Sequence, residues 1–476
     1  MAEAKKLSNR ALKRAKNKNK DHLKPSFEQV PTSIEITPEL DCQNGLIGIV
    51  GGGLAGFALA LALQRKGIKS IVFEKDQSFE ERAQGYGLTI QQAGRAMKVL
   101  GLTDIVLHAG VASSSHFIFD NNGRVILFWG TSSASGADTW DPSRNCHVAR
   151  QVLRKSLLDA LNPSLVQVIW GFQLDSTNQV NDKVIVSGTS SKEIPLTFEF
   201  DALAACDGIR STIRTTVLAT ETANDFRYLN SFVMLGIFDN KPFPVLHDRM
   251  IQMSDGKARM FVMPFDESRS MWQLSFGMRK EQDAIQLSKS GSCRLKGEAL
   301  KQCESFKGPI LDLIECTDIG LITGYPVYDR DPLTLRIGYN PAFDRVTLLG
   351  DAAHPMSPFK GQGANQALID AVDLADCIAS SPLKDLPTAL RVYEAKMIPR
   401  TTPKVLASRE SIDLLHCDKF KDIRYQLERR GFGQQDEFAV LMETLQREGV
   451  GIWSDGNELN NACDRYAVIH GHSKPE

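Results

Sequence analysis

The stretch Leu46-Ile-Gly-Ile-Val-Gly-Gly-Gly-Leu-Ala-Gly56 decides the fold of this chain. The apolar run 46–50 predicts a buried strand, the glycines at 51, 53 and 56 follow it, and residues 54–66 have the composition of a helix. Residues 69–73 predict a second strand, which Glu74 follows. This order is the dinucleotide-binding fingerprint. The alternative, a glycine-rich surface turn, does not account for the apolar runs on both sides.

Each residue of the fingerprint has a physical task. Gly51 permits a tight turn, Gly53 lets the backbone approach a pyrophosphate, and Gly56 lets the helix pack closely on the strand. The helix N-terminus offers unpaired N–H groups and a positive dipole end to phosphates. Glu74 can accept hydrogen bonds from ribose hydroxyls, and its charge disfavours a 2′-phosphate. The site therefore favours FAD or NAD over NADP.

The bulk properties indicate an ordinary globular protein. Its 476 residues allow two or three structural units, and a formal net charge of −1 shows no global bias toward nucleic acid. The nine cysteines have neither C-x-x-C nor metal-ligand spacing, so we expect reduced thiols, no metal site, and an intracellular, cytoplasmic protein. The apolar run 57–63 is far shorter than the roughly 20 residues of a membrane span, and no secretory signal precedes it.

Residues 1–44 form a segment of different composition. Nine Lys and Arg residues stand among the first 24 positions against Glu3 and Asp21, with few large apolar residues. Such a segment cannot bury enough surface to offset its ordering entropy, which predicts a disordered basic arm. It is either a solvated tail or a segment for nuclear targeting, RNA contact or attraction to an anionic membrane. Its role stays open.

The middle of the chain predicts a second sheet. Asn121-Asn-Gly123 between two apolar runs is a strong hairpin signal, and alternating strands recur between residues 229 and 325. We expect a mostly antiparallel sheet that walls one side of a cavity, with Trp272, Met260 and Met263 as apolar core rather than pocket lining. A helix is predicted over 147–161, with Arg150 at its start, and a β-meander is predicted over 164–200.

A second informative stretch is Val346-Thr-Leu-Leu-Gly-Asp351. The buried strand 346–349 delivers Gly350 and Asp351 at its carboxyl end, where open α/β sheets bind ligands. A loop with Pro355, Gly361 and Gly363 follows, and residues 364–379 predict a helix whose N-terminus is free to face a ligand. His354 also lies in this loop, where a histidine invites a catalytic interpretation.

Three stretches together resemble the class A flavoprotein monooxygenases, of the para-hydroxybenzoate hydroxylase type. They are Gly51–Gly56 with Glu74, Asp207-Gly208 with Arg214, and Gly350-Asp351 through Asn365. The resemblance covers roughly residues 45–410. It implies an α/β fold: a Rossmann-like FAD-binding domain (45–114, 145–228 and 326–400), an inserted antiparallel β-sheet substrate domain (115–144 and 229–325) and a C-terminal helical region (401–476).

The resemblance also implies which residues bind FAD. Gly51, Gly53, Gly56 and Glu74 would hold the ADP half, Asp351 the ribitol hydroxyls, and Gly361 to Asn365 the pyrimidine end of the flavin ring. Asp207-Gly208 resembles a motif linked to FAD and NAD(P)H, although Ala205-Cys206 replaces the usual Gly-Ala before it. Arg82 either reaches the cofactor or is a surface cation. The full set of cofactor-binding candidates is Gly51, Gly53, Leu54, Ala55, Gly56, Glu74, Lys75, Arg82, Gly87, Arg150, Asp207, Gly208, Gly350, Asp351, Pro355, Gly361, Gly363, Ala364 and Asn365.

The implied reaction is a hydroxylation. NAD(P)H as co-substrate reduces FAD, O₂ adds at C4a of the flavin, and the C4a-hydroperoxyflavin passes oxygen to a small aromatic or other electron-rich substrate. A second interpretation keeps FAD in a dehydrogenase, epoxidase or reductase of a small or prenylated molecule. A third is non-enzymatic, with the basic arm as the working part. The sequence identifies no catalytic side chain, no substrate, no preference between NADH and NADPH, and no oligomeric state.

Overall fold

The computed structural model describes residues 45–81, 85–113, 115–123, 125–130, 145–218, 226–243, 246–334, 340–422 and 425–426. The predicted basic arm and Arg82 lie outside the described residues. So does the part of the predicted C-terminal region that follows residue 426. The seven cysteines in the described ranges are free thiols. No described helix combines the length and apolar composition that crossing a membrane requires.

A parallel sheet of five strands forms the nucleotide-binding half, as the sequence predicts. Its order is β18-β12-β1-β2-β8, and every pair is parallel. The order reverses between β1 and β12, and ligands bind at the carboxyl ends of the strands at such a switch point. The strands are β1 (Leu46–Val50), β2 (Lys69–Glu74), β8 (Val166–Trp170), β12 (Ala202–Ala205) and β18 (Val346–Leu348).

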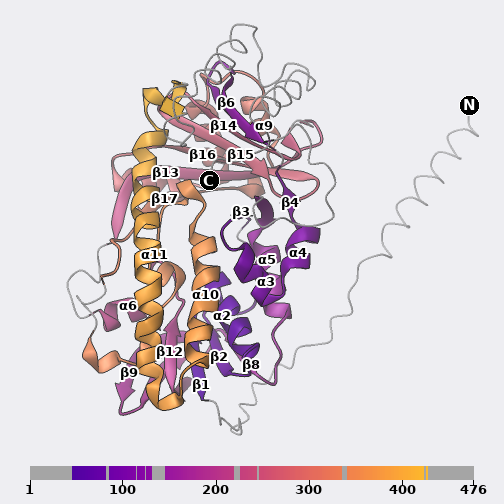
Figure 1. The fold of residues 1–476 in the computed structure, drawn as a ribbon. Coiled ribbons are helices and arrows are strands. Elements are labelled where there is room, and N and C mark those ends of the chain that lie inside the picture. The colour runs from indigo at the N-terminus through magenta and orange to yellow at the C-terminus, as the bar shows by residue number, and fades with distance from the viewer. Residues whose placement is uncertain are drawn as a thin grey trace, which may run out of the picture. The chain divides into compact units, whose positions relative to one another are not determined.

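Helices and two small sheets surround this sheet (Figure 1). Helix α2 packs against α10, and α11 packs against α10 and reaches both β18 and the large sheet. The helices are α2 (Leu54–Gln64), α3 (Gly94–Leu100), α4 (Thr103–Ala109), α5 (Arg150–Asp159), α6 (Thr212–Val217), α10 (Gly363–Ala379) and α11 (Leu386–Leu415). The small sheets have the orders β3-β7-β4 and β11-β10-β9, formed by β3 (Gly87–Ile90), β4 (Val111–Ala112), β7 (Cys146–Ala149), β9 (Gln173–Val180), β10 (Lys183–Thr189) and β11 (Pro195–Phe200).

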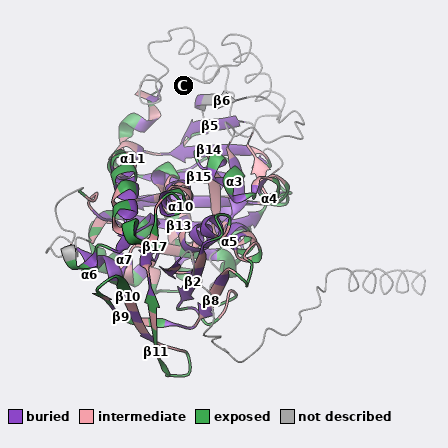
Figure 2. Cartoon of the chain, turned by 60° about the horizontal axis from the view of Figure 1, so that its bottom comes forward, coloured by how far each residue is buried: buried purple, intermediate pink, exposed green. Residues whose placement is uncertain are grey.

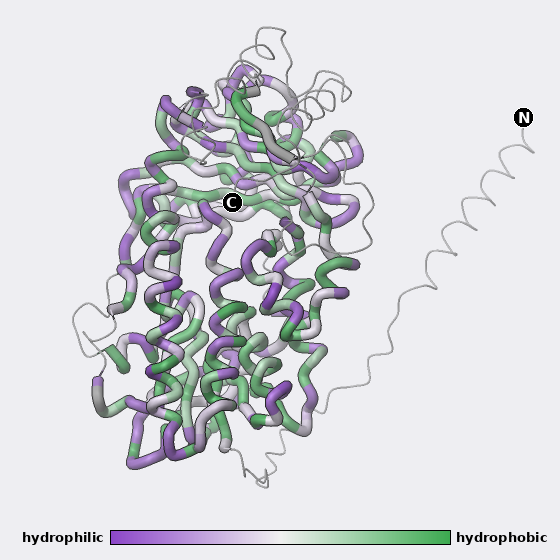
Figure 3. Tube along the Cα trace, viewed as in Figure 1, coloured by the Kyte–Doolittle hydropathy of each residue, from purple (hydrophilic) through white to green (hydrophobic). Residues whose placement is uncertain are grey.

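A seven-stranded sheet forms the other half, in the order β17-β13-β16-β15-β14-β5-β6. Only the β14–β5 pair is parallel. Hydrophobic residues run along its strands, which are largely buried (Figures 2 and 3). The strands are β5 (Ser115–Asp120), β6 (Val125–Gly130), β13 (Arg227–Asp239), β14 (Arg249–Ser254), β15 (Ala258–Pro264), β16 (Arg269–Gly277) and β17 (Ile322–Asp329).

Three further helices cover one face of the large sheet: α7 (Glu281–Ser288), α8 (Ser292–Gln302) and α9 (Ile310–Cys316). Trp272 is fully buried on this side, and its Nε1 donates to Thr317 Oγ1 at 2.9 Å. Met260 is also fully buried, so both side chains belong to the core, as expected. The 3₁₀ turns are η3 (Ile319–Leu321), η4 (Pro341–Phe343), η5 (Gly350–Ala352), η6 (Pro358–Lys360), η7 (Leu383–Asp385) and η8 (Asp418–Lys421).

Two details of the sequence prediction are wrong. The helix predicted from residue 147 begins at Arg150, because residues 146–149 pair with β3 as strand β7. The run at 165–170 does not belong to a meander, because β8 pairs with β2 at the edge of the parallel sheet, and β9 takes its place beside β10. In both cases the deciding partner is distant in sequence, which a local pattern cannot reveal. The three-domain division stays a prediction; α11 runs without a break through its boundary at residue 400.

Candidate active site

The two glycine-bearing strand tips converge. A Cβ placed on Gly350 would lie 3.1 Å from the Cβ of Ala55 at the start of α2 and 3.2 Å from that of Ala367 in α10. The Oδ1 atom of Asp351 lies 3.7 Å from the position of a Cβ on Gly363, the first residue of α10. The N-termini of α2 and α10 and the end of β18 therefore meet at one place.

The glycines of the first turn separate into two kinds. Gly51 has φ +110°, and a Cβ there would lie 2.3 Å from the carbonyl oxygen of Cys206; a Cβ on Gly56 would lie 1.9 Å from the carbonyl oxygen of Gly51. These two positions need glycine for the packing of the chain itself. A Cβ on Gly53 would meet nothing within 4 Å, and Gly53 caps α2 without a side-chain hydrogen bond. Gly53 therefore faces open space in front of a helix N-terminus, followed by Leu54, which is buried.

Glu74 is buried at the tip of β2 and is held in place by backbone groups. Its Oε2 accepts from the N–H of Gly52 at 2.8 Å, and its Oε1 accepts from the N–H of Asp76 at 3.1 Å. The glycine turn and the acid thus form one unit, as the fingerprint predicts. The side chain of Lys75 is exposed.

Arg154 also contacts Gly52 and Glu74, and the sequence pattern did not predict this role. Its Nε donates to the carbonyl oxygen of Gly52 at 2.8 Å, its Nη2 lies 3.8 Å from Glu74 Oε2, and the side chain is 2% exposed. The guanidinium lies 5.0–5.7 Å from the ring centroids of Phe57, Phe79 and Trp170. One signal was present: Arg154 stands four residues after Arg150, on the same helix face, beside Leu153.

We expect Arg154→Met to destabilise the protein by about 1–3 kcal/mol, because the Gly52 carbonyl loses its buried donor while the apolar contacts are largely kept. Urea unfolding of the apoprotein measures the change. Lys155→Met is the matched control, since Lys155 forms its i,i+4 ion pair with Asp159 on the exposed face, where such a pair contributes at most about 0.5 kcal/mol. Equal effects of the two substitutions would show that Arg154 does not support the turn.

The Asp207-Gly208 pair lies behind the first glycine turn. Asp207 Oδ2 accepts from the N–H of Thr212 at 3.0 Å at the start of α6, and burial raises the pKa of this carboxyl although hydrogen bonds oppose the effect. A Cβ on Gly208 would meet nothing within 4 Å. Arg214, in α6, is buried, and its Nη1 donates to the carbonyl oxygens of Ala352 and Ala353 at 2.9 and 2.7 Å. The motif of Asp207, Gly208 and Arg214 thus supports the loop that follows Gly350 and Asp351.

Asp351 follows the Gly350 turn and lies beside the start of α10. Its side chain is exposed, yet the surrounding protein desolvates the carboxyl group and raises its pKa, an effect that the charges of His354 and Arg150 partly offset. The influence of Arg150 also places that side chain near Asp351, and its guanidinium lies 5.4 Å from the ring centroid of Tyr86.

The sequence model of the FAD binding domain family matches residues 46–300 and 338–402. The chain belongs to the FAD-dependent monooxygenases of class A. It is 29% identical over 367 residues to aurachin C monooxygenase/isomerase of Stigmatella aurantiaca, covering 76% of this chain and 87% of that protein. It is 28% identical over 375 residues to a chloroplastic zeaxanthin epoxidase of Oryza sativa subsp. japonica, covering 74% of this chain and 53% of that protein. The structure of Klebsiella pneumoniae HpxO with FAD and uric acid has the same fold, with a TM-score of 0.66, 22% identity and coverage of 88% and 96%.

The residues of this monooxygenase fit FAD. Gly53, Gly208 and Gly361 all face space that a Cβ would not fill, and the N-termini of α2 and α10 carry no acidic residue in their first turns. Two helix N-termini and a desolvated carboxylate therefore lie close together, which suits a diphosphate, polyol hydroxyls and an electron-accepting ring.

One other candidate of the monooxygenase, Asn365, contacts mainly protein. Asn365 is fully buried; its Oδ1 accepts from the N–H groups of Gln91 and Ala93 at 2.9 and 3.2 Å, and its Nδ2 donates to the carbonyls of Thr89 and Gly361 at 2.9 and 3.0 Å. It ties the start of α10 to the segment after β3. Among the remaining candidates, Pro355 is buried and Ala364 is half-buried.

The monooxygenase also holds Gly87 against the large sheet. A Cβ on Gly87 would lie 2.7 Å from Met263 Cε, and the Gly87 N–H donates to Met271 Sδ at 3.2 Å. Tyr325 shares a sheet face with Met271 by the strand registers. It is 38% exposed, yet burial raises the pKa of its phenol, and Tyr86 adds to the effect. Tyr325 therefore lies on the face of the sheet that meets Gly87.

Proposed function

We propose that the protein uses NAD(P)H and O₂ to hydroxylate a small aromatic or other electron-rich organic substrate. The observation that carries this proposal is the convergence of the N-terminus of α2, the Gly350-Asp351 turn and the start of α10 at one place. FAD, when bound, supplies the acceptance of hydride from NAD(P)H and the activation of O₂. The residues of the chain supply binding, orientation and the exclusion of water.

The proposed roles follow from the local chemistry. The N-terminus of α2, with Gly53, would hold the diphosphate, and Glu74 would accept from ribose hydroxyls. Asp351 would accept from the ribitol hydroxyls. The N-terminus of α10 at Gly363 would stabilise negative charge on the reduced ring through the helix dipole. NAD(P)H would bind transiently in a groove without a fingerprint of its own.

The sheet face at Tyr325 supports an aromatic substrate. Methionine sulfur and aromatic rings line the sheet face near Gly87, including Met263, Met271 and Phe265. Such side chains favour flat apolar molecules and exclude water from the reacting centre. The phenol of Tyr325 is neutral near pH 7, as tyrosines ordinarily are, and burial raises its pKa further, so it can donate one hydrogen bond to a substrate oxygen.

The test is turnover under ¹⁸O₂. With a substrate from an aromatic screen, NAD(P)H oxidation should exceed the substrate-free rate, and the product should carry one ¹⁸O atom in a new hydroxyl group. Parallel reactions in H₂¹⁸O with ordinary O₂ should give unlabelled product. Unlabelled product under ¹⁸O₂ would instead indicate a dehydrogenase or reductase. A labelled epoxide would support the second candidate, epoxidation, which the similarity to zeaxanthin epoxidase favours.

A further inference from the structure

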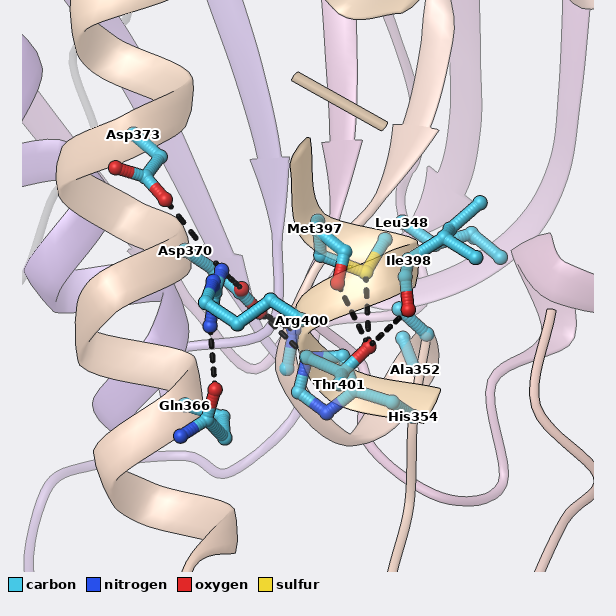
Figure 4. A network of polar contacts seen from close by, with 12 residues as sticks. Leu348, Ala352, His354, Gln366, Asp370, Asp373, Met397, Ile398, Arg400 and Thr401 are labelled. Atoms are coloured by element: carbon cyan, nitrogen blue, oxygen red, sulfur yellow. Dashed lines mark hydrogen bonds and ion pairs between the residues drawn. The ribbon is translucent and has the colours of Figure 1, made fainter. Parts of the chain in front are cut away.

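A buried carboxylate lies directly behind the Gly350 turn (Figure 4). Asp370, in α10, is fully buried, and its Oδ2 accepts from the N–H of Gly350 at 3.0 Å and from His354 Nε2 at 2.6 Å. Its Oδ1 accepts from Arg400 Nη2 at 2.6 Å. One side chain therefore connects the turn, the loop after it, and helices α10 and α11.

The charges of Asp370 and its partners determine which atoms donate and which accept in these hydrogen bonds. Burial acts to raise the pKa of Asp370, but His354 and Arg400 outweigh it, and the net shift is downward. An ionised carboxylate can only accept, so His354 Nε2 carries the hydrogen. Charge-assisted bonds of this kind are stronger than bonds between neutral groups. The group is thus a rigid attachment and not a loose polar contact.

The Gly350 turn needs such an attachment. Gly350 has φ +61° and no side chain, so only its neighbours and its own hydrogen bonds fix the direction of the following residue, Asp351. The attachment extends further, because Arg400 Nη1 also donates to Gln366 Oε1, and Gln366 Nε2 donates to Gln92 Oε1 at 3.0 Å. The turn is therefore tied to the segment that Asn365 also holds.

We propose that Asp370, held by His354 and Arg400, is a positioning residue that fixes the direction of Asp351 and so sets the affinity of the flavin end of the FAD site. The adenosine end depends on Gly53 and Glu74, which Asp370 does not contact in the described structure. The inference rests on the proposed placement of FAD. It makes a specific claim: Asp370 governs one end of the cofactor site and not the other.

The experiment compares FAD with ADP as ligands of the apoprotein. Asp370→Asn keeps the size of the side chain but presents an amide N–H to a donor, either the Gly350 N–H or Arg400. We expect its Kd for FAD to rise about ten- to a hundredfold, because a charge-assisted attachment of the turn is lost, while its Kd for ADP changes less than about twofold. Flavin fluorescence quenching and calorimetry give the two values.

Two further comparisons provide a control and an alternative test. Asp373→Asn is the matched control: Asp373 lies on α10, 3.4 Å from Arg400, but does not contact the turn, and neither Kd should change. His354→Gln retains a side-chain N–H for Asp370 and should bind FAD more tightly than His354→Leu, again with unchanged ADP binding. This pair keeps the test available if Asp370→Asn does not fold.

Three outcomes would overturn the proposal. The first is unchanged FAD binding in both Asp370→Asn and His354→Leu. The second is that these variants weaken FAD and ADP binding to the same degree. The third is that Asp373→Asn has the same effect as Asp370→Asn. A failure of the FAD placement itself looks different. In that case Gly53→Val, which should weaken both ligands, leaves ADP binding intact.

Discussion

Gly53→Val should remove FAD from the purified protein while leaving the apoprotein folded. A valine side chain at this position meets no protein atom near its Cβ, and the backbone of Gly53 (φ −82°, ψ −167°) is open to any residue. Its branched methyl groups would instead occupy the space where a diphosphate must approach the backbone. We expect the 450 nm absorbance per protein to fall at least tenfold, with unfolding free energy within about 1 kcal/mol of wild type, the scale of an N-cap preference.

Substitutions at two other glycines serve as controls for Gly53→Val. Gly297→Val, in α8 outside the site, also meets nothing within 4 Å and should keep both the flavin and the fold. Gly56→Val should fail to fold, because a Cβ there would lie 1.9 Å from the carbonyl oxygen of Gly51. If Gly53→Val stays yellow, the diphosphate does not lie at the N-terminus of α2.

The sequence predicts the two strand tips because their signals are local. A strand, a glycine and a helix follow one another within about 20 residues at Gly51–Gly56, and again at Gly350–Gly363. Their convergence is also predictable, since parallel strands end at one edge of a sheet. The proximity of Gly350 to Ala55 has this origin. The general position of the site therefore follows from pattern and topology alone.

The supports of the site were not predictable, because their partners are far away in sequence. Arg154 lies 102 residues from Gly52, and Arg400 lies 30 residues from Asp370. In the sequence, a buried arginine on a helix looks the same as a solvated one. The edge strand β8 was assigned to a meander for the same reason: its apolar run fits either sheet, and only its pairing with β2 decides.

Asp351→Asn should weaken FAD binding and stabilise the apoprotein at pH 7. The carboxylate would accept hydrogen bonds from the ribitol, and loss of a charge-assisted bond costs about 1.5–3 kcal/mol, or roughly ten- to a hundredfold in Kd. Without the cofactor, burial raises the pKa of Asp351, although His354 and Arg150 oppose the effect, so the ionised form is unfavourable in the folded protein. A neutral amide avoids this cost. Flavin titration and urea unfolding measure the two opposite changes.

The pH dependence distinguishes this cost from a packing effect. A carboxyl group whose folded pKa lies above its ordinary value of 3.8 binds more protons in the folded than in the unfolded state between the two values, so it lowers stability as pH rises. The stability advantage of Asp351→Asn should thus be complete above the raised pKa and shrink as pH falls toward 3.8. Asp413→Asn, at an exposed carboxyl group, is the control substitution. If Asp351→Asn instead lowers stability at pH 7, groups of the folded chain already donate hydrogen bonds to this carboxylate. Asp351 would then not be the acceptor for the hydroxyl groups of a cofactor.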